Sequence, residues 1–161
     1  MTETLDGSLF GPQQPCFGCS PTHPHGFHLS FQREGDGVVT RFLPTELHQG
    51  PPGIMHGGLV ATVADEAAAW ALIAARGRFG FTTTMEARFA RPVRVGKETV
   101  ARAAIVKDAG RIVRVEVRVA QDGLDCFTGT FAFAVLDEQA AEALLGGPLP
   151  EAWRRFSRPR S

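Results

Sequence analysis

The run from Gly57 to Arg76 constrains the fold more than any other part of the sequence. It is rich in Ala, Leu and Val and contains neither Gly nor Pro after Gly58. It therefore predicts one long helix that stops at Gly77. Successive side chains turn by about 100° around a helix. One face then carries Gly58, Ala61, Thr62, Asp65, Ala68, Ala69 and Leu72, and the other carries Val60, Val63, Ala67, Trp70 and Ala74. Both faces are apolar or small, so other elements should surround the helix on all sides.

Four later segments can provide that cover. In the clearest one, four valines alternate with Arg114, Glu116 and Arg118, which predicts a strand with one buried and one solvent-facing side. Turn-forming residues separate the segments, as expected for successive antiparallel strands. Residues 27–33 and 38–43 predict an additional hairpin. The four predicted strands are 82–91, 99–107, 111–121 and 126–135.

Length and composition limit the classes of protein to which this chain can belong. The 161 residues favour one domain, 27–136, preceded by an irregular arm (1–26) and followed by a short helix and a loose tail (137–161). Because 17 basic residues balance 17 acidic ones, we expect no nucleic-acid partner. The apolar stretch 59–75 contains charged residues and is too short for a membrane span, and acids near the N-terminus argue against a secretory signal. We expect a cytoplasmic protein.

The start of the long helix carries the most informative pattern. His48 and His56 flank a loop that leads into Gly57 and Gly58, and Asp65 follows two turns later. A helix N-terminus offers unpaired N–H groups and a partial positive charge, which stabilise an oxygen that gains negative charge. A carboxylate on the same face as Gly58 suits general-base or nucleophilic chemistry on a carbonyl held there.

With these residues the sequence resembles the hotdog-fold acyl-CoA thioesterases, most closely the phenylacetate-pathway type. That resemblance implies an α+β fold in which a curved antiparallel sheet wraps one long central helix. It also implies a homodimer or homotetramer with active sites between protomers, and no cofactor or catalytic metal. The matching motifs are Cys16 to Cys19, Pro24 to Gly26, Pro52 to Gly58, Asp65 to Ala67 and Phe89 to Pro92.

The resemblance also implies roles for single residues. The Gly58 N–H would polarise the thioester carbonyl, Asp65 would activate water or attack directly, and Thr82 would assist from the next strand. His56 would orient the turn. Gln49 stands seven residues before His56, further upstream than the Asn or Gln of some relatives. The expected substrate-binding residues are Gly57, His48, Gln49, Thr83 and Arg91, with Arg91 chosen for the phosphates of CoA.

Four alternatives remain open. A hotdog hydratase or dehydratase would pair His48 with Asp65 as acid and base, and a non-catalytic module would bind acyl-CoA without hydrolysis. Glu66 is the lesser candidate for the catalytic carboxylate. Finally, Cys16 and Cys19 with nearby histidines have the spacing of a closed zinc site, although one Cys-x-x-Cys pair is a weak signal and packing is the preferred interpretation. The nearby histidines are His23, His25 and His28.

Overall fold

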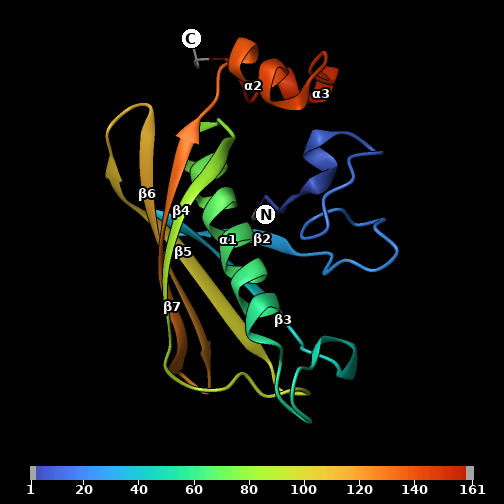
Figure 1. Ribbon diagram of the computed structural model, residues 1–161, viewed down its shortest axis with the longest axis vertical. Coiled ribbons are helices and arrows are strands. Elements are labelled where there is room, and N and C mark those ends of the chain that lie inside the picture. The colour runs from blue at the N-terminus through green and yellow to red at the C-terminus, as the bar shows by residue number, and fades with distance from the viewer. Residues whose placement is uncertain (1–2, 159–161) are drawn as a thin grey trace.

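A curved antiparallel sheet wraps one long helix in the computed structural model, which describes residues 3–158 (Figure 1). The helices are α1 (Gly57–Arg76), α2 (Glu138–Leu145) and α3 (Glu151–Arg154), with short 3-10 turns η1 (Gly7–Phe10) and η2 (Glu46–His48). The strands are β1 (Leu5–Asp6), β2 (Ser30–Glu34), β3 (Gly37–Phe42), β4 (Gly80–Phe89), β5 (Thr99–Asp108), β6 (Ile112–Gln121) and β7 (Leu124–Val135). Their order in the sheet is β1-β2-β3-β5-β6-β7-β4.

Helix α1 begins and ends where the sequence predicts. His56 is its N-cap, and Gly77 ends it in the left-handed conformation with φ of 60°, where glycine is favoured. The Gly77 N–H donates to the carbonyl of Ile73 at 2.8 Å. By length and composition alone this helix would also qualify as a membrane span. Its apolar side chains instead pack against the concave face of the sheet, and this packing explains its composition.

The core lies between α1 and the sheet. The alternating valines of β6 point inward as predicted, and Val115 and Val117 are both fully buried. From β7, Phe131 fills the same layer, and Trp70 of α1 stacks on Phe31 of β2 with ring centroids 5.7 Å apart. The central strands therefore fix the axis of the helix and the direction of each of its faces.

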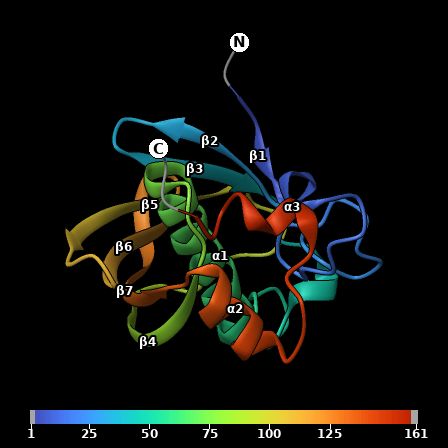
Figure 2. The ribbon, with the colours of Figure 1, turned by 90° about the horizontal axis from the view of Figure 1, so that it is seen from above.

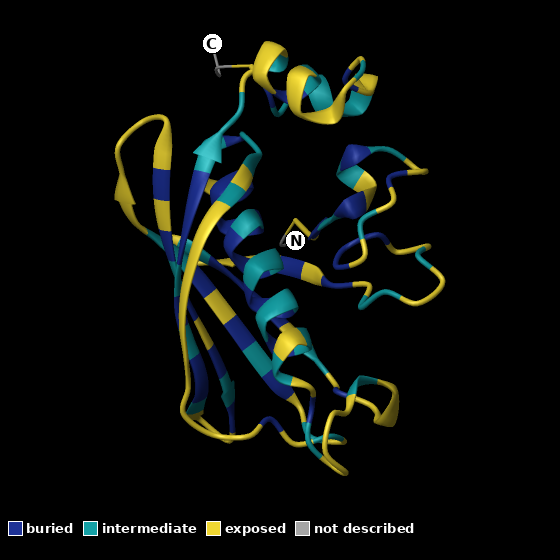
Figure 3. Ribbon diagram, viewed as in Figure 1, coloured by how far each residue is buried: buried dark blue, intermediate teal, exposed yellow. Residues whose placement is uncertain are grey.

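One side of the helix remains open, which differs from the expected complete cover. β4 is an edge strand, and its residues are exposed along most of their length (Figure 3). Met85 and Phe89 of this strand are 51% and 55% exposed. The facing strip of α1 is small and partly exposed, and it comprises Gly58, Ala61, Thr62, Asp65 and Ala69. Ala68, expected on this strip, is fully buried.

Both ends of the chain are more ordered than the sequence suggests. The arm is not wholly irregular, because β1 pairs with β2. The tail is not loose either: α3 lies beside η1 (Figure 2), and the rings of Trp153 and Phe156 pack on Phe10 with centroids 4.5 and 4.4 Å away. The aromatic contacts account for this order through residue 158. Residues 1–2 of the predicted arm and 159–161 of the predicted tail lie outside the described part.

Candidate active site

A hydrogen bond joins the two residues that the sequence places on α1 and the following strand. Thr82 Oγ1 of β4 donates to Asp65 Oδ1 at 2.7 Å. The sheet register resolves which of three consecutive threonines faces the helix, because Thr82 pairs with the inward-facing Phe133. A bulge at Thr83 interrupts the ladder just after it, and the Thr83 hydroxyl donates to the Ala132 carbonyl instead. The predicted substrate role of Thr83 therefore has no direct support in its contacts.

The surroundings of Asp65 change its proton affinity. Burial raises the pKa of Asp65 above its ordinary value of 3.8, and the hydrogen bond from Thr82 acts in the opposite direction. No ion pair involves Asp65 among residues 3–158. Its carboxylate is thus a partly desolvated base whose only side-chain hydrogen bond among residues 3–158 comes from Thr82.

At the N-terminus of α1, a side chain of the protein already binds the N–H group that the sequence assigns to the substrate. His56 Nδ1 accepts from the Gly58 N–H at 3.0 Å, so the N-cap side chain occupies the donor expected to polarise a carbonyl. A substrate oxygen can use this N–H only if the exposed His56 ring turns away.

Gly57 lies under the ring of Phe89, and a Cβ at Gly57 would stand 3.4 Å from that ring. Phe89 therefore lines the candidate site. It lies in one of the motifs that carry the resemblance, but the sequence did not single it out as a site residue.

The loop before the helix is held by its own residues. His48 Nδ1 accepts from the Thr45 N–H at 3.0 Å, and its carbonyl accepts from the His56 N–H at 2.8 Å. Its ring packs on Phe27, and burial lowers the pKa of His48. Gln49 Oε1 accepts from Gly53 N–H at 2.9 Å across the same loop. These contacts make His48 and Gln49 loop-shaping residues and do not bring His48 to Asp65.

A shallow groove runs from the helix start toward the end of β4. Its volume is about 290 Å³, and its lining includes Gly57, Val60, Phe89 and Arg91. The guanidinium of Arg91 donates to the Asp125 carbonyl at 2.7 Å and remains exposed. The groove is mostly apolar with one cation at its edge, which fits part of an acyl thioester with a phosphate-bearing group.

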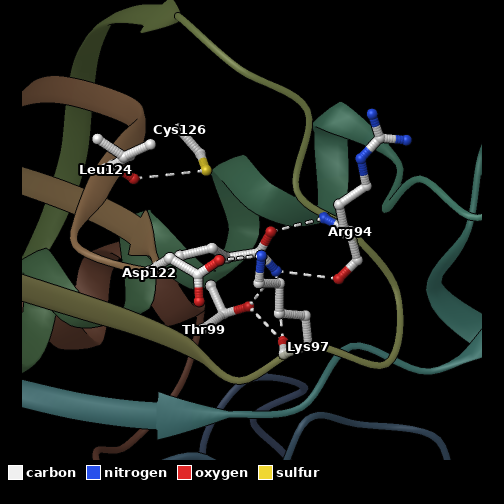
Figure 4. Close-up of polar contacts among 7 residues, drawn as sticks. Arg94, Lys97, Thr99, Asp122, Leu124 and Cys126 are labelled. Atoms are coloured by element: carbon white, nitrogen blue, oxygen red, sulfur yellow. Dashed lines mark hydrogen bonds and ion pairs between the residues drawn. The ribbon is translucent and has the colours of Figure 1, made fainter.

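A buried glutamine fixes the loop that forms one wall of this groove. Gln121 is 6% exposed, and its amide bonds both the N–H and the carbonyl of Arg94 at 2.8 and 2.9 Å. It also donates to Thr99 Oγ1 at 2.8 Å, and Lys97 pairs with Asp122 beside it (Figure 4). In the same loop the Val93 carbonyl accepts a hydrogen bond from the Met55 N–H. This bond connects the loop to the segment that leads into α1.

Glu66, the lesser candidate, faces a different neighbourhood. Its carboxylate accepts from Trp70 Nε1 at 3.2 Å and from the Cys16 thiol at 3.4 Å. Burial, with the Cys16 sulfur nearby, raises the pKa of Glu66 to about 8. Glu66 therefore lies apart from the pair formed by Asp65 and Thr82.

Comparisons with known proteins show which family and which solved structures this chain is similar to. Residues 52–126 match the family model described as Thioesterase superfamily, just under half of the chain. The matched segment contains Gly58, Asp65, Thr82 and Arg91 and excludes the two cysteines of the arm. Comparison with curated protein sequences finds no match.

Solved structures decide the fold. A thioesterase superfamily protein superposes with a TM-score of 0.70 at 19% identity over 81% of this chain, which spans 66% of that protein's length. This is a hotdog fold. A hypothetical thioesterase with coenzyme A from Streptococcus pneumoniae superposes at 0.62, with 18% identity over 66% of this chain and 87% of that one. A phenylacetic acid degradation-related protein from Ralstonia eutropha also scores 0.62, at 20% identity over 68% and 86%.

Proposed function

We propose that this hotdog protein hydrolyses CoA thioesters to a carboxylate and free CoA. The hydrogen bond between Thr82 and Asp65 on the open strip of α1 is the observation that carries the proposal. It holds a partly desolvated carboxylate on the helix face that also bears Gly58. The family match across this segment supports acyl-CoA thioesterase activity in general.

In this proposal water, or Asp65 itself, attacks the thioester carbonyl. As a general base Asp65 takes one proton from water while the hydroxide adds to the carbonyl carbon. As a nucleophile it forms an anhydride that water then opens. In both routes the carbonyl oxygen replaces His56 Nδ1 on the Gly58 N–H, where the helix N-terminus stabilises its growing negative charge. The carbon–sulfur bond breaks and CoA leaves as the thiolate.

The open side of the site favours self-association. β4 has an unpaired edge with exposed Met85 and Phe89, and a second protomer can pair with that edge and cover the strip of α1. The groove of about 290 Å³ is at the low end for a ligand site. We infer that a homo-oligomer completes the acyl pocket, and that Arg91 serves the phosphates of CoA.

Thiol release tests the function. Purified protein is incubated with short, medium, long and aryl CoA thioesters, and free CoA is measured with a thiol reagent. The proposal expects catalytic release from at least one class. Hydration of an enoyl thioester without thiol release would identify a hydratase, and saturable binding without turnover would identify a binding module. Either result overturns the proposed hydrolysis.

A further inference from the structure

Two cysteines of the arm and one carboxylate of α1 form a compact cluster apart from the proposed active site. In this Cys-Cys-Glu cluster, the sulfurs of Cys16 and Cys19 and a carboxylate oxygen of Glu66 all lie within 4.8 Å of one another. Cys16 Sγ stands 3.4 and 3.6 Å from the two carboxylate oxygens. The cluster therefore links segments that are 50 residues apart in sequence.

The arm presents its cysteines from a tight turn. The Ser20 N–H donates to the Cys16 carbonyl at 3.1 Å. The Gly7 N–H holds the Cys19 carbonyl at 3.0 Å, which fixes the turn against the beginning of the chain. The turn brings both sulfurs close to Glu66, and cysteine binds metals as the thiolate.

Glu66 reaches this turn because Gly18 leaves room for it. A Cβ at Gly18 would lie 2.6 Å from Glu66 Oε2, which is too close for any other residue without movement of the carboxylate. The Trp70 N–H donates to one carboxylate oxygen at 3.2 Å. Among residues 3–158 no basic side chain pairs with Glu66. Three acidic groups thus meet with no cationic side chain among their partners.

We propose that Cys16, Cys19 and Glu66 bind one Zn²⁺ ion. Two thiolates and a carboxylate are ligands that zinc accepts in tetrahedral geometry, and thiolate donors favour zinc over magnesium or calcium. Each cysteine that is protonated before binding releases its proton when it binds the ion. Cys16 also lines a cleft of about 620 Å³ between the arm and the C-terminal helices, from which water can supply the fourth ligand.

This ligand set differs from the zinc alternative that the sequence offers. His28 bonds the carbonyl of His23, His25 donates its N–H to the His23 ring, and none of the three joins the cluster. Glu66 is about 100° around α1 from Asp65, so the ion would tie the arm to the helix without entering the thioester site. The site is independent of the proposed hydrolysis.

Metal content tests this proposal. The full chain is reduced, loaded with Zn²⁺, freed of excess metal by gel filtration and analysed by mass spectrometry for zinc per chain. We expect one bound ion, and we expect Cys16→Ser, Cys19→Ser and Glu66→Gln to weaken binding about tenfold or more, as even the loss of an outer-shell partner does. Cys126→Ala is the matched control, because this buried cysteine lies on β7 beside Leu124 and outside the cluster (Figure 4).

A second measurement uses the wild-type chain, so it does not depend on whether the variants fold. Co²⁺ replaces Zn²⁺ in the wild-type chain, where two thiolate ligands produce an intense sulfur-to-cobalt charge-transfer band. The band is expected at one equivalent of Co²⁺ and should disappear on addition of Zn²⁺. A folded, reduced wild-type chain that binds neither ion overturns the proposal. Full zinc occupancy in a folded Cys19→Ser variant overturns it as well.

Discussion

Replacing Thr82 with Val removes the hydroxyl that donates to Asp65 and keeps a β-branched side chain of similar shape. The lost bond is 2.7 Å long and its acceptor is a carboxylate. A hydrogen bond to a charged group contributes about 1.5–3 kcal/mol. If the whole contribution is used to hold Asp65 in its reactive position and ionised form, kcat/KM falls by about 10- to 150-fold, since about 1.4 kcal/mol equals a factor of ten.

The assay is thiol release from the best CoA thioester of the panel, measured across pH. The Thr82 bond lowers the pKa of Asp65, so its removal should also move the acid limb of the pH profile to higher pH. Thr84→Val is the matched control, because Thr84 lies beyond the bulge at Thr83 and makes no side-chain hydrogen bond among residues 3–158. Equal kcat/KM for Thr82→Val and Thr84→Val would refute the reasoning.

Three further outcomes are expected. Burial raises the pKa of Asp65, so the acid limb of kcat/KM in the wild-type protein should lie above pH 3.8; a limb at or below that value contradicts this. Phe131→Ala should cost about 3–5 kcal/mol in urea unfolding because Phe131 is fully buried, whereas Phe89→Ala should cost far less. Met85→Glu on the open edge should produce monomers in sedimentation, while Leu124→Glu, equally exposed elsewhere, should not; a monomeric wild-type chain would exclude the proposed oligomer.

The central helix and the β6 strand follow from local rules. An apolar run that starts after Gly57 and stops at Gly77 leaves little choice of boundaries, and Gly77 adopts the left-handed conformation that glycine favours. Alternation along β6 reports directly which side chains enter the core, as the full burial of Val115 and Val117 shows. These predictions are confirmed because each depends only on neighbours in sequence.

The site required information that the sequence does not contain. Three consecutive threonines are chemically equivalent in a strand pattern, and only pairing with Phe133 and the bulge at Thr83 direct Thr82 toward Asp65. A bulge depends on how two distant strands meet, so periodicity cannot locate it. The predicted assisting role of Thr82 depended on the family resemblance, and its contact with Asp65 is a finding of the structure.

His48 and His56 show how local hydrogen bonds limit what the sequence can predict about a side chain. The resemblance assigns His48 to substrate binding and His56 to orienting the turn. In the structure His56 caps α1 through Gly58, in keeping with that role, whereas His48 caps η2 through Thr45. Local hydrogen bonds to nearby N–H groups compete with longer-range roles. The Glu66 cluster was hidden for a related reason, since its partners Cys16 and Cys19 lie in a segment whose path over the sheet no local pattern specifies.

Hydrolysis by an Asp65→Asn variant tests the central claim most directly. Asn keeps the size of the side chain and can still bond Thr82, but it cannot accept a proton from water or attack a carbonyl. Because burial raises the pKa of Asp65 in the folded state, ionisation costs stability as the pH rises above 3.8. The variant should therefore unfold at the same or a higher urea concentration at neutral pH. We expect its kcat for thiol release to fall by about a thousandfold with its oligomeric state unchanged. Turnover at the wild-type rate would contradict the assignment of Asp65 as the catalytic carboxylate.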